Sequence, residues 1–133
     1  MKTLIVTSFA LLACVSGSAM AACSGTPLSV SQLTTLLTGK TVCGSAGTDQ
    51  WQEEHKASGE LWDYKKGPGD PVDPEEKVGT WSVQSGGIAS GKINYQYDGG
   101  TGFSYTVYDN GNGTYSFCGP STVEVTIKAA PPC

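Results

Sequence analysis

The stretch INYQYDGGTGFSYTV, residues 93–107, decides the fold. Apolar and polar side chains alternate on both sides of a central Asp-Gly-Gly, and this alternation is typical of strands with one buried face. The Asp-Gly-Gly sequence at residues 98–100 is favourable turn chemistry for a tight connection between two strands. The stretch therefore predicts an antiparallel β-hairpin.

The same pattern recurs through most of the chain. Turn-rich segments at residues 85–87 and 109–113 separate further short runs of alternating side chains. Eight hairpin-connected strands predict an all-β fold, either an antiparallel up-and-down barrel or a curled meander. An eight-stranded barrel leaves room for packed side chains or for one small ligand. The expected strands are residues 41–45, 51–57, 60–66, 78–84, 93–97, 103–107, 115–117 and 123–127.

One segment ahead of the strands has a helical pattern. Its leucines lie at positions i, i+3 and i+4 within SQLTTLLTG, residues 31–39. Ser29 or Ser31 can cap the start, and Gly39 suits the position just after the end. We therefore expect one short N-terminal helix that covers one end of the barrel.

Ten side chains are expected to point inward, because each lies on the apolar parity of its strand. Truncating one of them, Phe103, to alanine should then cost about 3–5 kcal/mol, as for large aromatic side chains in a core. The ten are Trp81, Val83, Ile93, Tyr95, Phe103, Tyr105, Val107, Phe117, Val125 and Ile127.

The first 21 residues have the pattern of a bacterial export signal. Lys2 adds a positive charge, residues 3–15 form an apolar run, and small residues follow up to an A-x-A site at Ala21. The apolar run is shorter than the roughly 20 residues that a membrane-spanning helix needs. We predict a signal peptide over residues 1–21 and a single β domain over residues 22–133, exported to the periplasm or beyond the cell.

A lipid anchor is the alternative to simple cleavage. The sequence LLAC, which ends at Cys14, has the form of a bacterial lipobox. The sequence MAAC, which ends at Cys23, is a poorer match because it lacks an aliphatic residue three places before the cysteine. Cleavage after Ala21 is the interpretation that we favour.

Cysteines are expected to stabilise this small domain. Removal of Cys14 with the signal leaves four, and an even number in a short exported chain predicts two disulfides with three possible connectivities. Their spacing lacks the close C-x-x-C pairs of a metal cluster. Because chain termini often lie close together, we expect a Cys23–Cys133 bridge, which leaves Cys43–Cys118. Local pairing, Cys23–Cys43 with Cys118–Cys133, is the alternative.

The net charge of the chain argues against two classes of binding partner. Without the signal, seven lysines face twelve acidic side chains, a net charge of −5, and the chain has no arginine. Recognition of nucleic acid relies on arginine and on basic patches, so this composition argues against it. It argues equally against binding to an anionic membrane surface.

Catalytic and cofactor signatures are missing from the sequence. There is one histidine, and there is no G-x-S-x-G nucleophile elbow, P-loop, dinucleotide fingerprint or haem attachment motif. The acidic, proline-rich segment at residues 67–77 does not have the spacing of an EF-hand loop. We therefore expect neither enzymatic activity nor a cofactor or metal.

Chemistry-bearing residues are densest in WQEEHKASGELWDYKK, residues 51–66, which holds two of the three tryptophans and the only histidine. A two-residue turn at residues 58–59 would put a Glu and a His among aromatics on one face, as in a site that orients a ligand. The candidate ligand-binding residues on that face are Trp51, Glu53, His55, Trp62 and Tyr64.

A different loop length would separate these residues. A three-residue loop over residues 58–60 would set His55 opposite Asp63, and a shift of one residue moves the side chains of one strand to the other face. The segment would then be a solvated charged face, with Trp51 and Trp62 serving the core.

The order of features resembles a known kind of domain. A short helix is followed by TGKT at residues 38–41, an acidic-aromatic hairpin, and VGTWSV at residues 78–83. This order is similar to that of small lipocalin-like β-barrel domains of secreted bacterial proteins, many of which have no assigned function. The resemblance implies the fold alone. The family places its G-x-W near the first strand, whereas GTW lies in the fourth here, so no binding residue is carried over.

Two functions follow as hypotheses. The first is a binding module that holds a small apolar molecule or blocks a partner protein. The second is a structural or envelope-associated protein without a pocket. A cavity lined by Trp51, Trp62, Tyr95 and Tyr105 would favour the first hypothesis, and a completely filled interior would favour the second.

Overall fold

The computed structural model describes residues 22–46, 49–64 and 75–133. The expected signal peptide and most of the acidic loop lie outside these residues. The elements are α1 (Val30–Leu37), β1 (Thr41–Ala46), β2 (Asp49–His55), β3 (Glu60–Asp63), β4 (Glu76–Gly87), β5 (Ser90–Tyr97), β6 (Gly102–Asp109), β7 (Tyr115–Cys118) and β8 (Thr122–Lys128).

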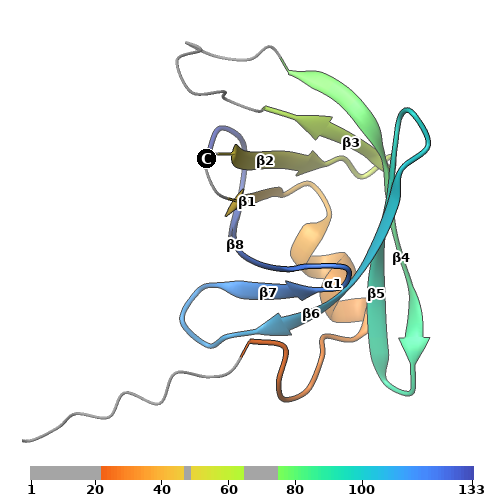
Figure 1. Ribbon diagram of the computed structural model, residues 1–133, viewed down its shortest axis with the longest axis vertical. Coiled ribbons are helices and arrows are strands. Elements are labelled where there is room, and N and C mark those ends of the chain that lie inside the picture. The colour runs from red at the N-terminus through yellow and green to blue at the C-terminus, as the bar shows by residue number, and fades with distance from the viewer. Residues whose placement is uncertain (1–21, 47–48, 65–74) are drawn as a thin grey trace, which may run out of the picture.

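The eight strands form a closed antiparallel barrel in sequence order (Figure 1). Closure comes from β1 and β8, where Thr41 lies opposite Lys128 and Gly44 opposite Val125. Every strand thus has a hydrogen-bonded neighbour on both sides. The predicted all-β fold is confirmed, in its barrel form.

Helix α1 covers one end of the barrel. Ser29 caps its start in a capping box with Gln32, and Gly39 follows its end with φ of +71°. Leu33 and Leu37 are fully buried and belong to the barrel core, and the helix packs against β4 and β5 (Figure 1). The expected position of the helix is confirmed.

The core follows the predicted parity. Six of the ten expected inward side chains are buried, and the other four are partly buried against them. Alternation is clearest in β5, where Gly91, Ile93 and Tyr95 are buried and Lys92 between them is exposed. The partly buried four are Trp81, Val83, Phe103 and Ile127.

The register of the β2–β3 hairpin differs from both expected alternatives. Glu53 lies opposite Asp63, and His55 lies opposite Leu61. The loop has three residues, 57–59, because the amide of Lys56 donates to the Glu60 carbonyl over 3.0 Å. Gly59 has φ of +89°, which suits the last residue of a three-residue hairpin loop. The turn therefore closes one residue earlier than the longer expected loop.

Disulfide connectivity is the third possibility, so both pairings considered from the sequence were wrong. The bridges are Cys23–Cys118 and Cys43–Cys133. The assumption that the termini lie together fails. The segment after β8 returns across the outside of β1 and β2, where the Cys133 amide donates to the buried Gln52 side chain over 2.9 Å. The N-terminal segment instead meets the barrel beside β6 and β7 (Figure 1).

Candidate functional site

The five predicted ligand-binding residues are divided between the two faces of the β2–β3 hairpin. Trp51, Glu53 and His55 share the inner face of β2, because residues two apart in a strand point the same way. Trp62 and Tyr64 lie on the outer face, since Trp62 pairs with Glu54 rather than with His55. These residues do not form a single site.

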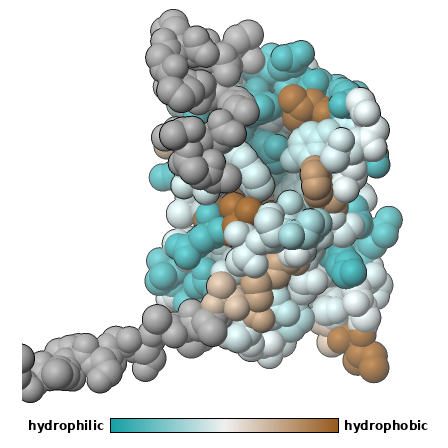
Figure 2. Space-filling model, viewed as in Figure 1, coloured by the Kyte–Doolittle hydropathy of each residue, from teal (hydrophilic) through white to brown (hydrophobic). Residues whose placement is uncertain are grey.

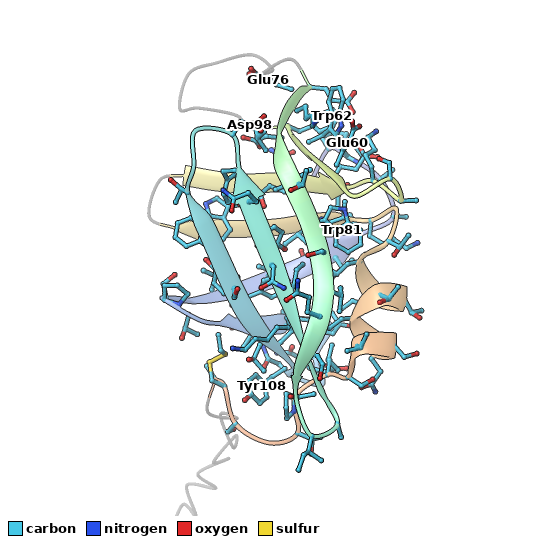
Figure 3. The ribbon with its side chains drawn as sticks, turned by 90° about the vertical axis from the view of Figure 1, so that its right-hand side faces the viewer. Glu60, Trp62, Glu76, Trp81, Asp98 and Tyr108 are labelled. Atoms are coloured by element: carbon cyan, nitrogen blue, oxygen red, sulfur yellow. A yellow bond between two sulfur atoms is a disulfide. The ribbon has the colours of Figure 1, made fainter. Side chains whose placement is uncertain are left out.

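The outer face is a network of charged groups. The Trp62 indole N–H donates to the Glu60 carboxylate over 3.1 Å, and the Lys56 ammonium lies 5.6 Å from the centre of the Trp62 ring. Figure 3 shows Glu60 and Trp62 beside each other on β3, apart from Trp81. Lys56 also pairs with Glu54 at 3.0 Å and with Glu75 at 3.2 Å. Such half-exposed pairs are ordinary surface chemistry.

Tyr64 belongs to the same outer network. Its hydrogen bond with Glu75 raises the pKa of Tyr64 to about 12. The same contact holds the pKa of Glu75 below its usual value. Tyr64 and Glu75 therefore interact with each other on the outer face and do not face the barrel interior.

His55 is fully buried beneath the end of α1. Its Nδ1 lies 3.1 Å from the Glu53 carbonyl oxygen, and its Nε2 lies 2.8 Å from the Tyr95 hydroxyl. A carbonyl oxygen only accepts, so Nδ1 carries the proton and the Tyr95 hydroxyl donates to Nε2. The ring also meets the Trp81 indole edge-on, with 5.0 Å between centres.

Burial fixes the charge of His55. Desolvation lowers the pKa of His55 to about 4, although hydrogen bonds to the Glu53 and Lys40 carbonyls oppose the change. The imidazole is therefore neutral near pH 7, with both nitrogens occupied. Its arrangement is that of a structural residue that fixes β2 against β5.

Glu53 has a different environment two residues earlier on β2. Its Oε1 accepts a hydrogen bond of 2.7 Å from the Tyr97 hydroxyl. Burial raises the pKa of Glu53 to about 7; the Tyr97 hydrogen bond opposes this increase, and the negative charge of Asp63 adds to it. Near neutral pH this carboxyl group can therefore gain or lose a proton.

A cavity of about 320 Å³ lies next to Glu53. Its residues come from the parts of β2, β5 and β6 far from α1, and from the β7–β8 connection. The helix lies at the opposite end of β2, where the Gly39 amide just after α1 donates to the carbonyl of His55. We call this the mouth cavity; it is lined by Trp51, Glu53, Tyr97, Phe103, Tyr105 and Ser121.

Aromatic rings connect the mouth cavity to the core. Tyr97 meets Phe103 edge-on, with ring centres 6.0 Å apart, and stacks on Tyr95 at 6.2 Å. Tyr105 contacts both Tyr95 at 6.0 Å and Phe117 at 5.9 Å. These contacts give the cavity fixed apolar walls and one ionisable carboxyl group. Such a site can hold an apolar body and orient one polar group.

Sequence reasoning found part of this cavity. It named Trp51 and Glu53 as ligand-binding residues and Tyr105 as a possible cavity residue. It missed Tyr97 and Ser121, and it assigned Phe103 to the core alone. The alternation of residues 93–107 contains the signal for Tyr97, which shares the parity of the buried Tyr95.

The described residues hold neither a cluster of metal ligands nor a membrane-spanning helix. Within residues 22–46, 49–64 and 75–133, no group of three or more histidine, cysteine or acidic side chains is placed to hold a metal ion. In the same ranges, no helix has the length and apolar character needed to cross a membrane.

Comparison with known proteins identifies no relative. No family model, no curated protein and no solved structure matches this chain. Its fold alone defines its structural class: a closed eight-stranded antiparallel barrel with one short helix and two disulfides.

Proposed function

We propose that this protein is an exported, lipocalin-like binding protein that holds a small, mainly apolar molecule in the mouth cavity. The main support for this proposal is the cavity itself, where aromatic side chains surround the Glu53 carboxyl group, which is hydrogen-bonded to Tyr97. Ligand sites of this kind combine apolar walls with a few placed polar groups.

The division of the barrel interior supports binding over a purely structural role. A structural protein without a pocket would fill both ends, as the α1 end is filled by Leu33 and Leu37. The opposite end holds the mouth cavity instead. A partner protein that inserts one side chain there is the second candidate, since the cavity volume suits a single side chain as well as a small molecule.

Export is part of the proposal. Residues 1–21 have the sequence pattern of a signal peptide, and two disulfides suit an oxidising compartment. An exported binding protein would meet its ligand outside the cytoplasm.

Native mass spectrometry of the protein purified from its own host tests the function. We expect a bound species of small mass, and we expect Ser121→Trp to lose it because the indole would fill the mouth cavity. The matched control is Ser82→Trp on the exposed outer side of β4, which should keep the ligand. A wild-type protein that carries no small molecule and binds no added 2-phenylethanol would contradict the proposal. A co-purifying protein would favour the second candidate.

A further inference from the structure

Resting on the proposed function, we propose that the mouth cavity is selective for an organic cation, and that it binds the ammonium group of an aromatic or alkyl amine beside Glu53. The proposal follows from the charges at the cavity, the rings around it and the polar atoms that face it.

Acidic groups dominate the charge at the cavity. Glu53 lines it, and Asp63 lies directly opposite Glu53 on β3 and shares its inner face. Asp63 is close enough to disfavour the charged form of Glu53. Two neighbouring carboxylates in a partly desolvated site repel each other, and a cation placed beside them relieves that repulsion.

The described lining of the mouth cavity holds no basic side chain. Lys56, on the outer face of the hairpin, pairs with Glu54 and Glu75, and Lys77 of β4 pairs with Glu60. The chain has no arginine at all. A cationic ligand would therefore meet no competing protein charge among the lining residues.

Aromatic rings supply the second feature. Trp51, Tyr97, Phe103 and Tyr105 all line the cavity around Glu53. The face of an aromatic ring carries negative charge density, so it attracts a cation, most strongly where water is excluded. Four aromatic side chains around one carboxylate match an ammonium group that carries an apolar body. An anionic ligand would be repelled, and a neutral hydrocarbon would gain nothing from Glu53.

Hydrogen bonding leaves room for such a ligand. The Tyr97 hydroxyl donates to Oε1 of Glu53 and so holds the carboxylate in place. An ammonium N–H can donate to the carboxylate that Tyr97 holds, and such charge-assisted bonds are stronger than neutral ones.

Three probes of similar shape and different charge test the proposal. They are phenethylammonium, 2-phenylethanol and phenylacetate, titrated by calorimetry at pH 7.5. We expect the cation to bind about tenfold more tightly than the alcohol, as one charge-assisted hydrogen bond allows, and the anion to bind most weakly. Glu53→Gln should lower the affinity for the cation about tenfold and leave the affinity for the alcohol nearly unchanged.

Glu124→Gln is the matched control, because Glu124 is exposed on the outer side of β8. It removes the same charge from the molecule and should leave all three affinities unchanged. Equal affinities of the cation and the alcohol, or equal losses in the two variants, would overturn the cation proposal while the proposed function stands. Failure of all three probes to bind would overturn both.

The same titration at pH 5.5 provides a second readout. Protonated Glu53 cannot attract a cation, so the affinity for phenethylammonium should fall about tenfold while that for 2-phenylethanol stays constant. In the part of the chain that the structure describes, the titratable groups near Glu53 are Asp63, His55, Tyr95, Tyr97 and Tyr105. His55 and the tyrosines keep one protonation state between these pH values. A cation affinity that does not change with pH would contradict the role of Glu53.

Discussion

His55 and Glu53 lie two residues apart on the inner face of β2, yet their surroundings are opposite. His55 is sealed beneath α1, with both ring nitrogens hydrogen-bonded and its charge suppressed. Glu53 lies at the mouth cavity with a pKa near neutrality. The comparison shows that position along one strand separates a polar group buried among its hydrogen-bond partners from one that lines a cavity.

The largest effect is expected from truncating aromatic side chains at the two depths. Phe117→Ala should destabilise the protein by about 3–5 kcal/mol, because Phe117 is only 2% exposed and lies within the core. Phe103→Ala should cost about 1–2 kcal/mol, less than the sequence alone led us to expect, since Phe103 is partly buried and borders an existing cavity. Urea unfolding measures both. Equal losses would show that the mouth is packed as tightly as the core.

Removal of the buried histidine should have the next largest effect. His55→Ala should cost about 2–4 kcal/mol at pH 7, because it leaves a cavity and an unpaired Tyr95 hydroxyl. Lys92→Ala on the exposed side of β5 is the control and should change stability by less than about 0.5 kcal/mol.

That cost should also depend on pH. The folded pKa of His55, about 4, is below its unfolded value, so the unfolded state binds more protons between about pH 4 and 6.5. The stability of the wild type therefore falls as the pH decreases through this range, and His55→Ala escapes this loss. The difference between the two proteins should shrink by about 2 kcal/mol at pH 4.5. A constant difference would mean that His55 titrates normally in the fold.

Glu53→Gln should act in the opposite direction. The folded pKa of Glu53, about 7, is above its unfolded value, so stability is full below about pH 4.5 and falls as the pH rises toward 7. Glutamine keeps an oxygen for the Tyr97 hydroxyl and carries no charge. The variant should be more stable than the wild type by about 1–3 kcal/mol at pH 8, and about equal to it at pH 4.5. Thermal unfolding at the two pH values checks this, with Glu124→Gln as the unaffected reference.

The smallest effect is expected on the outer face of the hairpin. Trp62→Phe removes an indole hydrogen bond to Glu60 and keeps an aromatic ring beneath Lys56. Stability should change by less than about 1 kcal/mol, and ligand affinity should not change. A loss of binding in this variant would show that the functional surface lies outside the barrel.

Much of the fold was predictable because it depends on local pattern. The alternation around Tyr95 and Tyr105 gave the strand parity, and the leucine spacing gave α1. The β2–β3 register was not predictable, because both Ser58-Gly59 and a longer loop are acceptable turn chemistry. The hydrogen bond from the Lys56 amide to the Glu60 carbonyl decides it.

The candidate site and the disulfides depend on closure of the barrel, which a linear sequence does not reveal. Glu53 and Tyr97 are far apart in sequence and meet only because β2 and β5 face each other across the barrel. The pairing of Cys43 with Cys133 likewise depends on the path of the chain after β8. Sequence reasoning named Glu53 and the four cysteines, but it did not name Tyr97 and could not show which of these residues meet.

The Cys43–Cys133 bond has a mechanical consequence for the barrel. The first and last strands meet at the β1–β8 seam, which joins the parts of the barrel most distant in sequence. Because the bond ties the segment after β8 to β1, the seam cannot separate far while the bond is intact. Backbone amides on both sides, such as those of Val42 and Ile127, should exchange with deuterium only in openings that involve the whole barrel. Reduction of this one bond would turn the last strand into an end that can peel away from the first.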